Sequence, residues 1–271
     1  MRPRKKIFAA NYLRETIDSF DNIWDKKAYK SMDNPQHKWF KDVIGKYFEV
    51  VSDTPLIREQ RKRFAGIVNG YISDFEGKRS IPYRREVNDG VNIDFEEFYR
   101  LTTQRRSVRW YLPKPVPREV IDKAILAARQ SPSACNRQPF EFKIFDNADL
   151  VKELVEFPMG TKGYSHSIPV FAVIVGTLDA YAAERDRHLI YIDGALAAMT
   201  FMLALETLGL STCPINWPDI DDREKKMSSF LGLSIWQRPI MCLGLGYPDP
   251  EGEIAFSEKR NIAQIRNFNI R

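Results

Sequence analysis

The sequence is poor in the residues that build disulfide frameworks and metal sites. Its 271 residues include three cysteines and three histidines. Cys135, Cys213 and Cys242 are odd in number and show no C-x-x-C spacing, which argues against a disulfide framework and against a structural zinc or iron–sulfur site. The histidines form neither an H-x-x-x-H nor an H-E-x-x-H pattern, so we expect no metal site. We expect Cys135 and Cys213 to be small buried packing residues rather than reactive thiols.

Long apolar runs are also missing. No stretch reaches about 18 consecutive apolar residues, so the sequence predicts no transmembrane helix and no membrane partner. Residues 1–6 are basic, but the apolar stretch that follows them is too short for the core of a signal peptide. The sequence therefore predicts a cytoplasmic protein.

The chain has enough apolar residues for a large core and only a modest excess of charge. Hydrophobic residues make up 44% of it, and the formal net charge is +5. Residues 1–95 hold the whole excess, with 19 Lys and Arg against 14 Asp and Glu. Because the charges alternate in sign there, a solvated helical surface is favoured over a nucleic-acid patch, and no nucleic-acid partner is expected.

The first 94 residues read as a helical extension. Apolar residues recur at helical spacing in three stretches, and Thr54 and Pro55 fit the N-cap and the first position of the third helix. The predicted helices are 5–24, 37–51 and 55–75, and residues 76–93 read as a linker.

From residue 95 to residue 271 helices and strands alternate, which indicates a second domain. Its apolar strands are continuous and rich in β-branched residues, as in a sheet that helices cover on both faces. The predicted strands are 140–145, 170–175 and 240–245, and the predicted helices are 95–101, 117–130, 147–156 and 191–208.

Four polar segments of this domain are candidates for chemistry. Residues 105–109 place three guanidiniums and a hydroxyl together, which suits an anion clamp but also a solvated basic turn. Residues 131–140 offer side chains that donate and accept hydrogen bonds, in what is otherwise an ordinary capping loop. Residues 209–217 include small residues that let a flat ring approach the backbone, but they also fit a helix C-cap followed by a turn. Residues 257–260 are a further basic group or a solvated surface.

In their order and spacing these segments resemble the FMN-dependent nitroreductase family, over roughly residues 95–265. The matching text is Arg105-Arg106-Ser107-Val108-Arg109, Val116-Pro117, Ala127-Ala128, Pro132 to Pro139, Asp193 to Ala198, Leu208-Gly209-Leu210, Cys213-Pro214, Gly244 to Pro248, and Ser257 with Lys259.

The resemblance implies an α+β fold, a nitroreductase-like mixed central β-sheet flanked by helices, here with an N-terminal α-helical extension. It also implies a homodimer with FMN at the subunit interface, in which residues 191–208 form the dimer helix and residues 261–271 embrace the partner. The nearly uniform apolar character of 191–208 independently supports burial between subunits.

The resemblance also implies the positions of the cofactor-binding residues, and it implies no protein catalytic residue. The phosphate and ribityl end of FMN would be held by Arg105, Arg106, Ser107 and Arg109, with Lys259 and Arg260. The ring would be lined by Pro132, Ser133, Ala134, Asn136 and Gln138, and approached by Thr212 and Cys213 from the other subunit.

The implied reaction is a ping-pong cycle in which NADH or NADPH reduces FMN and a small planar acceptor, such as a nitroaromatic or a quinone, is then reduced. The alternative is a flavin-binding regulatory or interaction protein without turnover, whose N-terminal helices dock a partner. Ile215-Asn216-Trp217 replaces the Glu-Gly of the best-known nitroreductases, which leaves donor and acceptor open. Residues 157–167 lack the acidic–aromatic–lysine set of dehalogenating relatives, so deiodination is disfavoured.

Overall fold

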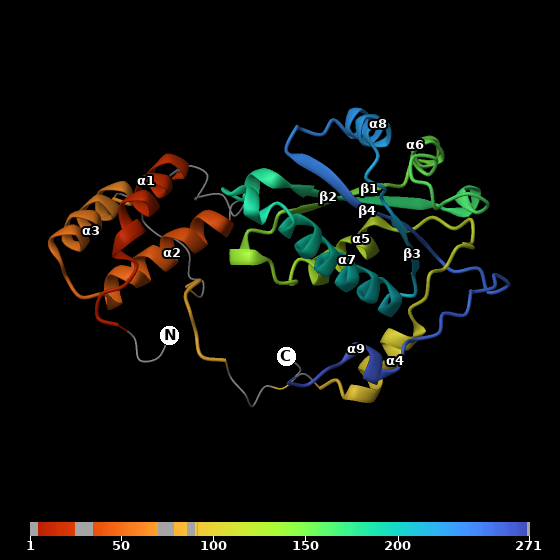
Figure 1. Cartoon of the computed structure of the whole chain (residues 1–271), viewed down its shortest axis with the longest axis horizontal. Coiled ribbons are helices and arrows are strands. Elements are labelled where there is room, and N and C mark those ends of the chain that lie inside the picture. Colours follow the sequence, from red (N-terminus) through yellow and green to blue (C-terminus); the bar gives the residue numbers. More distant parts are fainter. Residues whose placement is uncertain (1–4, 25–34, 70–78, 86–89, 91, 270–271) are drawn as a thin grey trace. The chain divides into compact units, whose positions relative to one another are not determined.

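The computed structural model describes residues 5–24, 35–69, 79–85, 90 and 92–269. The chain forms two compact units, Met1–Val91 and Asn92–Arg271, each with a core of its own (Figure 1). The division falls three residues before the boundary that the sequence suggested.

The N-terminal unit is built of three helices, α1 (Leu13–Ile23), α2 (Pro35–Val50) and α3 (Pro55–Ile67). The first helix starts later than predicted, because Ala9 takes a left-handed conformation (φ 57°) and a 3-10 turn, Ala10–Tyr12, precedes α1. The N-cap prediction is confirmed, since Thr54 Oγ1 accepts a hydrogen bond from Ile57 N at 3.2 Å. Helix α3 ends at Ile67, earlier than the predicted end at residue 75, and residues 70–75 lie outside the described residues. The three apolar stripes meet in one core, formed by Leu13, Ile17, Phe20, Ile44, Phe48, Val51, Ile57 and Phe64.

The C-terminal unit has the expected α+β fold, with a four-stranded sheet of order β1-β2-β4-β3. All three strand pairs are antiparallel, and a parallel bridge between Ser107 and Thr212 extends the sheet beyond β3. The strands are β1 (Phe140–Phe145), β2 (Val170–Thr177), β3 (Ser211–Asn216) and β4 (Gln237–Gly246).

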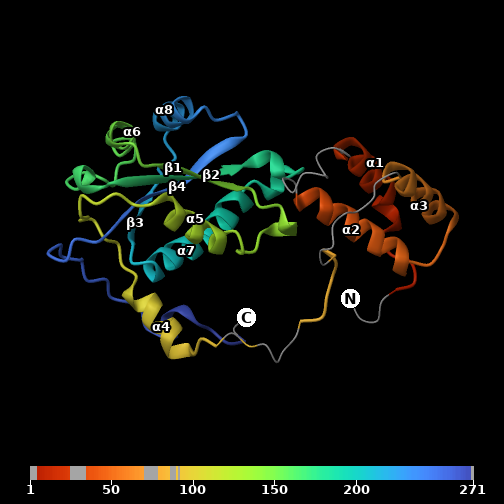
Figure 2. The same ribbon diagram turned by 180° about the vertical axis from the view of Figure 1, so that it is seen from behind.

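Helices cover both faces of this sheet, as Figures 1 and 2 show. On one face lie α5 (Arg118–Ala128) and α7 (Leu189–Thr207), and on the other lie α6 (Ala148–Leu154) and α8 (Asp221–Leu231). Alternate residues of β2 belong to the two cores: Ile174 packs with α5 and α7, and Val173 packs with α6 and α8. Burial on both faces explains why β2 is apolar throughout.

Helix α7 is apolar on all sides. One side is buried against the sheet, and the other exposes large apolar residues, Tyr191, Ile192, Leu196 and Met199. By length and composition the stretch Glu184–Thr207 is capable of crossing a membrane, which the run-length criterion did not detect. Core helices of soluble proteins meet the same criteria, and α7 is a helix that covers a sheet.

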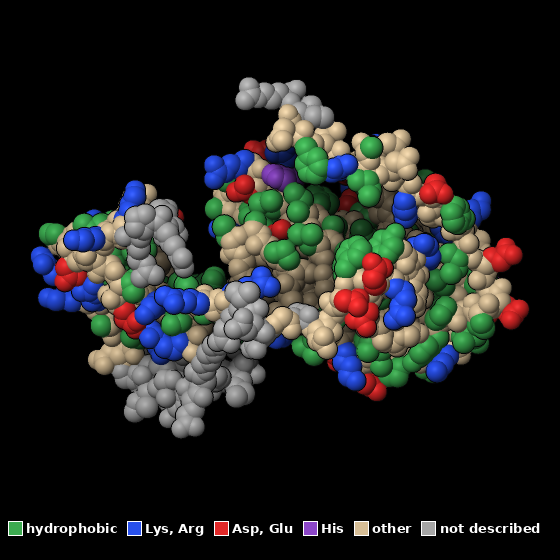
Figure 3. Space-filling view, turned by 90° about the horizontal axis from the view of Figure 1, so that it is seen from below, with side chains coloured by type: hydrophobic (Ala, Val, Ile, Leu, Met, Phe, Trp, Pro, Cys, Tyr) green, Lys and Arg blue, Asp and Glu red, His purple; other side chains and the backbone are tan. Residues whose placement is uncertain are grey.

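Two further helices, α4 (Phe95–Gln104) and α9 (Ile262–Ile265), bury none of their side chains. Figure 3 views the molecule from the side on which α4, α7 and α9 lie, and hydrophobic side chains form patches on the right-hand part of this view. Cys213 and Cys242 are buried free thiols, as expected for Cys213. The expectation that Cys135 is buried is wrong: it is exposed, because it lies in a loop that bulges from the end of α5.

Candidate functional site

Residues 105–109, which we call the arginine segment, leave the end of α4 and run beside β3. Val108 N donates to Thr212 O at 3.0 Å, and Ser107 forms the parallel bridge with Thr212. The structure therefore brings Arg105, Arg106 and Ser107, all half-buried, next to Thr212 and Cys213 within one chain. The arginine segment and the residues Thr212 and Cys213 therefore lie side by side in one sheet of one chain.

Three buried polar atoms near this segment have no hydrogen-bond partner among the described residues: Arg105 Nε, Thr212 Oγ1 and Glu206 Oε1. An unsatisfied buried polar group costs about 1–3 kcal/mol, so such groups together point to a polar ligand or to ordered water. Burial raises the pKa of the Glu206 carboxyl, and the hydrogen bond from Ser211 and the charge of Arg105 offset part of that rise. The positive charge of Arg105 therefore stands next to a half-buried acid.

The remaining arginines of the segment point to different surroundings. Arg106 Nη1 donates to Arg105 O at 3.1 Å. Arg109 is exposed, and its guanidinium carbon lies 5.7 Å from the centre of the Tyr164 ring. The Tyr164 hydroxyl is 3.6 Å from Cys213 Sγ, and burial raises the pKa of this tyrosine. Arg109 thus contacts Tyr164, whose hydroxyl lies next to Cys213.

Residues 131–138, which we call the left-handed loop, connect α5 to β1. Cys135, Asn136 and Gln138 have φ values of 54°, 55° and 50°, a conformation that costs a non-glycine residue roughly 1–2 kcal/mol. Gln138 N donates to Ser133 Oγ at 2.9 Å, and Asn136 N donates to Ser133 O at 3.0 Å. The loop is therefore tightly closed, while the side chains of Asn136 and Gln138 remain exposed.

Helix α7 holds this loop at two points. Asp193 Oδ2 accepts from Ala134 N at 3.2 Å, and Ser131 Oγ lies 2.8 Å from Thr200 Oγ1. Asp193 and Thr200 are seven residues apart and so lie on one side of the helix. Asp193 belongs to the matching family text, but the sequence alone predicted no role for it. An acidic residue in an apolar stretch of helix indicates a contact that satisfies it, and this pattern could have singled out Asp193.

The arginine segment and the left-handed loop lie toward opposite ends of α7. Asp193, which contacts the loop, and Glu206, which interacts with Arg105, are separated by about 20 Å along the helix axis at 1.5 Å per residue. One chain therefore brings together Arg105, Arg106, Ser107, Thr212 and Cys213, and separately brings together Pro132, Ser133, Ala134, Asn136 and Gln138. It does not bring the two groups to each other.

Lys259 and Arg260 lie in the exposed C-terminal segment. Lys259 N donates to Glu258 Oε1 at 2.9 Å, and Arg260 Nη2 donates to Gln264 O at 2.8 Å, at the capping box that begins α9. These described contacts join them to their own neighbours and not to the arginine segment.

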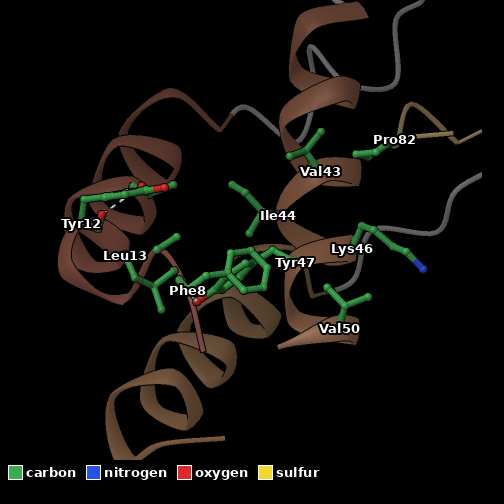
Figure 4. A pocket seen from close by; sticks show the side chains of 11 residues that line it. Phe8, Tyr12, Leu13, Val43, Ile44, Lys46, Tyr47, Val50 and Pro82 are labelled. Atoms are coloured by element: carbon green, nitrogen blue, oxygen red, sulfur yellow. Dashed lines mark hydrogen bonds between the residues drawn. The ribbon is translucent and has the colours of Figure 1, made fainter. Parts of the chain in front are cut away.

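The N-terminal unit contains a cavity of its own, of about 370 Å³, between the start of α1 and α2. Its walls are mainly apolar side chains such as Phe8, Leu13 and Ile44 (Figure 4). Lys46 stands at its rim with its nitrogen directed away from the cavity, and it pairs with Glu49 at 3.0 Å. Of the described residues that line the cavity, Lys46 is the only charged one, whereas Arg105 and Glu206 lie together at the arginine segment. Among the described residues no cluster of His, Cys, Asp and Glu side chains could hold a metal ion.

Comparison with known proteins identifies the family of the C-terminal unit. The model of the Nitroreductase family matches residues 102–162 and 158–247, which together make up more than half of the chain. An iodotyrosine deiodinase from Danio rerio is 41% identical over 202 residues, which cover 63% of this chain and 66% of that protein. A putative NADH dehydrogenase/NAD(P)H nitroreductase from Archaeoglobus fulgidus is 26% identical over 166 residues, which cover 61% of this chain and 93% of that protein.

The fold has close counterparts among solved structures. An FMN-dependent nitroreductase from Clostridium difficile aligns with a TM-score of 0.54 and 23% identity, over 63% of this chain and 98% of that chain. The aligned share is consistent with the C-terminal unit alone, since the family match begins at residue 102. The sequence match and the fold together show that this chain belongs to the nitroreductase family of oxidoreductases.

Proposed function

We propose that the C-terminal unit binds FMN and catalyses two-electron reduction of small planar acceptors. The observation that carries this proposal is the pairing of the arginine segment with β3, where Arg105 Nε and the Thr212 hydroxyl are both buried and have no hydrogen-bond partner among the described residues. Arg105, Arg106 and Ser107 would hold the phosphate and ribityl end, because guanidinium groups match phosphate oxygens with paired hydrogen bonds. Lys259 and Arg260 would add positive charge once the C-terminal segment closes on the site.

The left-handed loop fits the ring of such a cofactor. Its exposed Asn136 and Gln138 side chains donate and accept hydrogen bonds, as the edge of a flavin requires. Pro132, Ser133 and Ala134 would line the ring from the same loop, and Thr212 and Cys213 would approach it from β3.

We further propose that the site is completed in a homodimer. The two groups of residues lie about 20 Å apart along α7, so one chain cannot offer both to one ring. A two-fold axis across α7 would set the arginine segment of one subunit beside the left-handed loop of its partner. The exposed apolar side of α7 supports this arrangement, because large exposed apolar patches mark interfaces.

Bound FMN would supply the redox chemistry, taking hydride from NADH or NADPH and passing two electrons to an acceptor such as a nitroaromatic or a quinone in a ping-pong cycle. The protein would bind the phosphate, hold the ring edge and shield one ring face with β3. We assign no protein residue to proton transfer, because the described site contains no acid–base pair aimed at the ring.

A second candidate reaction is reductive deiodination, which the similarity to the Danio rerio enzyme brings into consideration. We expect this reaction to be absent. The segment of residues 157–167 is a compact run of turns, in which Thr161 Oγ1 donates to Val155 O at 2.5 Å and Tyr164 is buried. It offers Lys162 but contains no acidic residue, and its aromatic side chains Phe157 and Tyr164 are buried.

The test begins with the purified protein. We expect flavin absorbance near roughly 370 and 450 nm, a property of FMN itself. We then expect oxidation of NADH or NADPH that depends on a nitroaromatic or quinone acceptor, and no iodide release from iodotyrosine. Protein that stays colourless with excess FMN would exclude the proposal. Flavin-loaded protein without turnover with either donor would instead favour a regulatory or interaction protein, in which the N-terminal helices dock a partner.

A further inference from the structure

The strongest feature that the proposed function leaves unused is a buried carboxylate beneath the left-handed loop. Asp193 is 3% exposed and is the one charged residue in the first half of α7, residues 189–198. Its Oδ2 atom accepts two hydrogen bonds, one from Ala134 N at 3.2 Å and one from the Tyr181 hydroxyl. A charge is buried at a cost of several kcal/mol unless it is hydrogen-bonded, so this carboxylate holds its donors firmly.

Tyr181 links the same carboxylate to a second segment. It follows the turn Leu178–Ala180 in the connection from β2 to α7. Arg137 of the left-handed loop donates to Ala180 O at 2.7 Å, and its guanidinium carbon lies 5.6 Å from the centre of the Tyr181 ring. Burial raises the pKa of Tyr181, and the bond to Asp193 raises it further, so the phenol remains the donor.

These contacts stabilise the left-handed loop in its observed conformation. Three of its residues take the left-handed conformation without being glycine, and together they cost several kcal/mol that other contacts must offset. The bond from Ala134 N lies just before these residues, and the Arg137 contact lies among them. We propose that Asp193 is a positioning residue for the cofactor, which fixes the left-handed loop through Ala134 directly and through Tyr181 and Arg137 indirectly.

This inference rests on the proposed function for its effect on FMN, but its effect on the loop does not need the cofactor. Asp193→Ala removes the acceptor, whereas Asp193→Asn keeps a carbonyl oxygen that can accept the same two donors and removes the charge. Tyr181→Phe keeps the Ala134 bond and removes the link to the second segment. Asp122→Asn, at an exposed position on α5, is the matched control.

Two measurements then decide the matter. In the full-length protein without FMN, amide hydrogen exchange of residues 133–138 should be at least tenfold faster in Asp193→Ala, with a partial effect in Asp193→Asn and Tyr181→Phe and none in Asp122→Asn. The dissociation constant for FMN should rise at least tenfold in Asp193→Ala and less in Asp193→Asn, and the visible flavin spectrum and midpoint potential should change in the same order.

Unchanged loop exchange in Asp193→Ala overturns the inference, whether or not the wild type binds FMN. A wild type that fails to bind FMN overturns the proposed function instead, and loop exchange then still decides the role of Asp193. If Asp193→Ala does not fold, loop exchange is compared in Asp193→Asn and Tyr181→Phe instead. Exchange of residues 133–138 at the wild-type rate in both variants would then overturn the inference.

Discussion

Arg105 carries a permanent positive charge and belongs to the segment that pairs with Thr212. The Thr212 hydroxyl is buried and has no hydrogen-bond partner among the described residues. If Arg105 binds the phosphate of FMN, Arg105→Ala removes a hydrogen bond to a charged group and should weaken binding by about 1–3 kcal/mol, which is roughly a 5- to 150-fold rise in the dissociation constant. Fluorescence titration with FMN measures this change. Arg58→Ala, at an exposed position on α3, is the control. An unchanged affinity for FMN would remove Arg105 from the site.

Glu206 should make stability depend on pH in a direction opposite to that of a salt-bridged acid. Burial raises its pKa above the ordinary value of 4.5, so in that range the folded state binds more protons than the unfolded state. The contribution of Glu206 to stability is present below about pH 4.5 and is lost as the pH rises through the raised pKa.

The Glu206→Gln variant has no carboxyl at this position and therefore does not lose this contribution to stability as the pH rises. The difference in unfolding free energy between Glu206→Gln and the wild type should therefore increase with pH above about 4.5 and then level off. Denaturant unfolding of the protein without FMN, measured at a series of pH values, tests this. A difference for Glu206→Gln that stays flat over this pH range would mean that the carboxyl is not desolvated.

At the scale of elements, α7 packs against the sheet with almost no space. A Cβ atom at Gly194 of α7 would lie 2.6 Å from Ile240 Cδ1, and one at Gly176 of β2 would lie 2.7 Å from the same atom and 2.9 Å from Ile190 Cβ. Ile240 Cδ1 ends a side chain and can turn away, whereas Ile190 Cβ is fixed to the backbone of α7. We therefore expect Gly176→Ala to destabilise the fold by about 1–3 kcal/mol and Gly194→Ala by less.

A third substitution separates the two effects. Ile240→Val removes Cδ1, so Gly194→Ala in that background should be neutral or stabilising, because alanine favours a helix by about 1 kcal/mol over glycine. Gly176→Ala should stay destabilising there. A double-mutant cycle on unfolding free energies gives the coupling. Equal rescue of both glycine variants by Ile240→Val would contradict the packing described here.

How far the sequence predicts these elements depends on how strong their pattern is. The apolar strands β1, β2 and β4 and the helix α7 were predicted because continuous apolar or β-branched runs leave few alternatives. Strand β3 was assigned to a loop because Pro214 argues against a strand, but β3 is the last of the four strands, where a missing N–H is tolerated. Helix α8 was missed because its only buried residue is Met227, so it has almost no apolar stripe.

The site was predicted in part for a similar reason. Motif order indicated the arginine segment and the loop, but no local pattern predicts that Cys135, Asn136 and Gln138 are left-handed, since tertiary contacts from Asp193 impose this. The sequence also does not predict that Thr212 pairs with the arginine segment of the same chain. That contact depends on the register of β3, which was itself not predicted.

At the scale of the whole molecule, the C-terminal unit holds the two halves of the proposed FMN site toward opposite ends of α7, so in the proposed dimer assembly and cofactor binding should be coupled. Leu196 lies on the outward side of α7 and is 43% exposed. A glutamate there would place a charge in the middle of the proposed interface, where an unpaired buried charge is strongly unfavourable. We expect Leu196→Glu to be a monomer by light scattering and to lose FMN affinity at the same time.

Leu150 provides a close control, because it is 42% exposed and lies on α6, on the opposite face of the sheet. Leu150→Glu adds the same charge to a similar amount of exposed apolar surface, so it should leave both the mass and the FMN affinity unchanged. The coupling also makes the affinity of the wild type depend on protein concentration near the dimer dissociation constant, since only the dimer would present both halves to one ring. A Leu196→Glu monomer that binds FMN as tightly as the wild type would place the whole site within one chain and would contradict the shared-site arrangement.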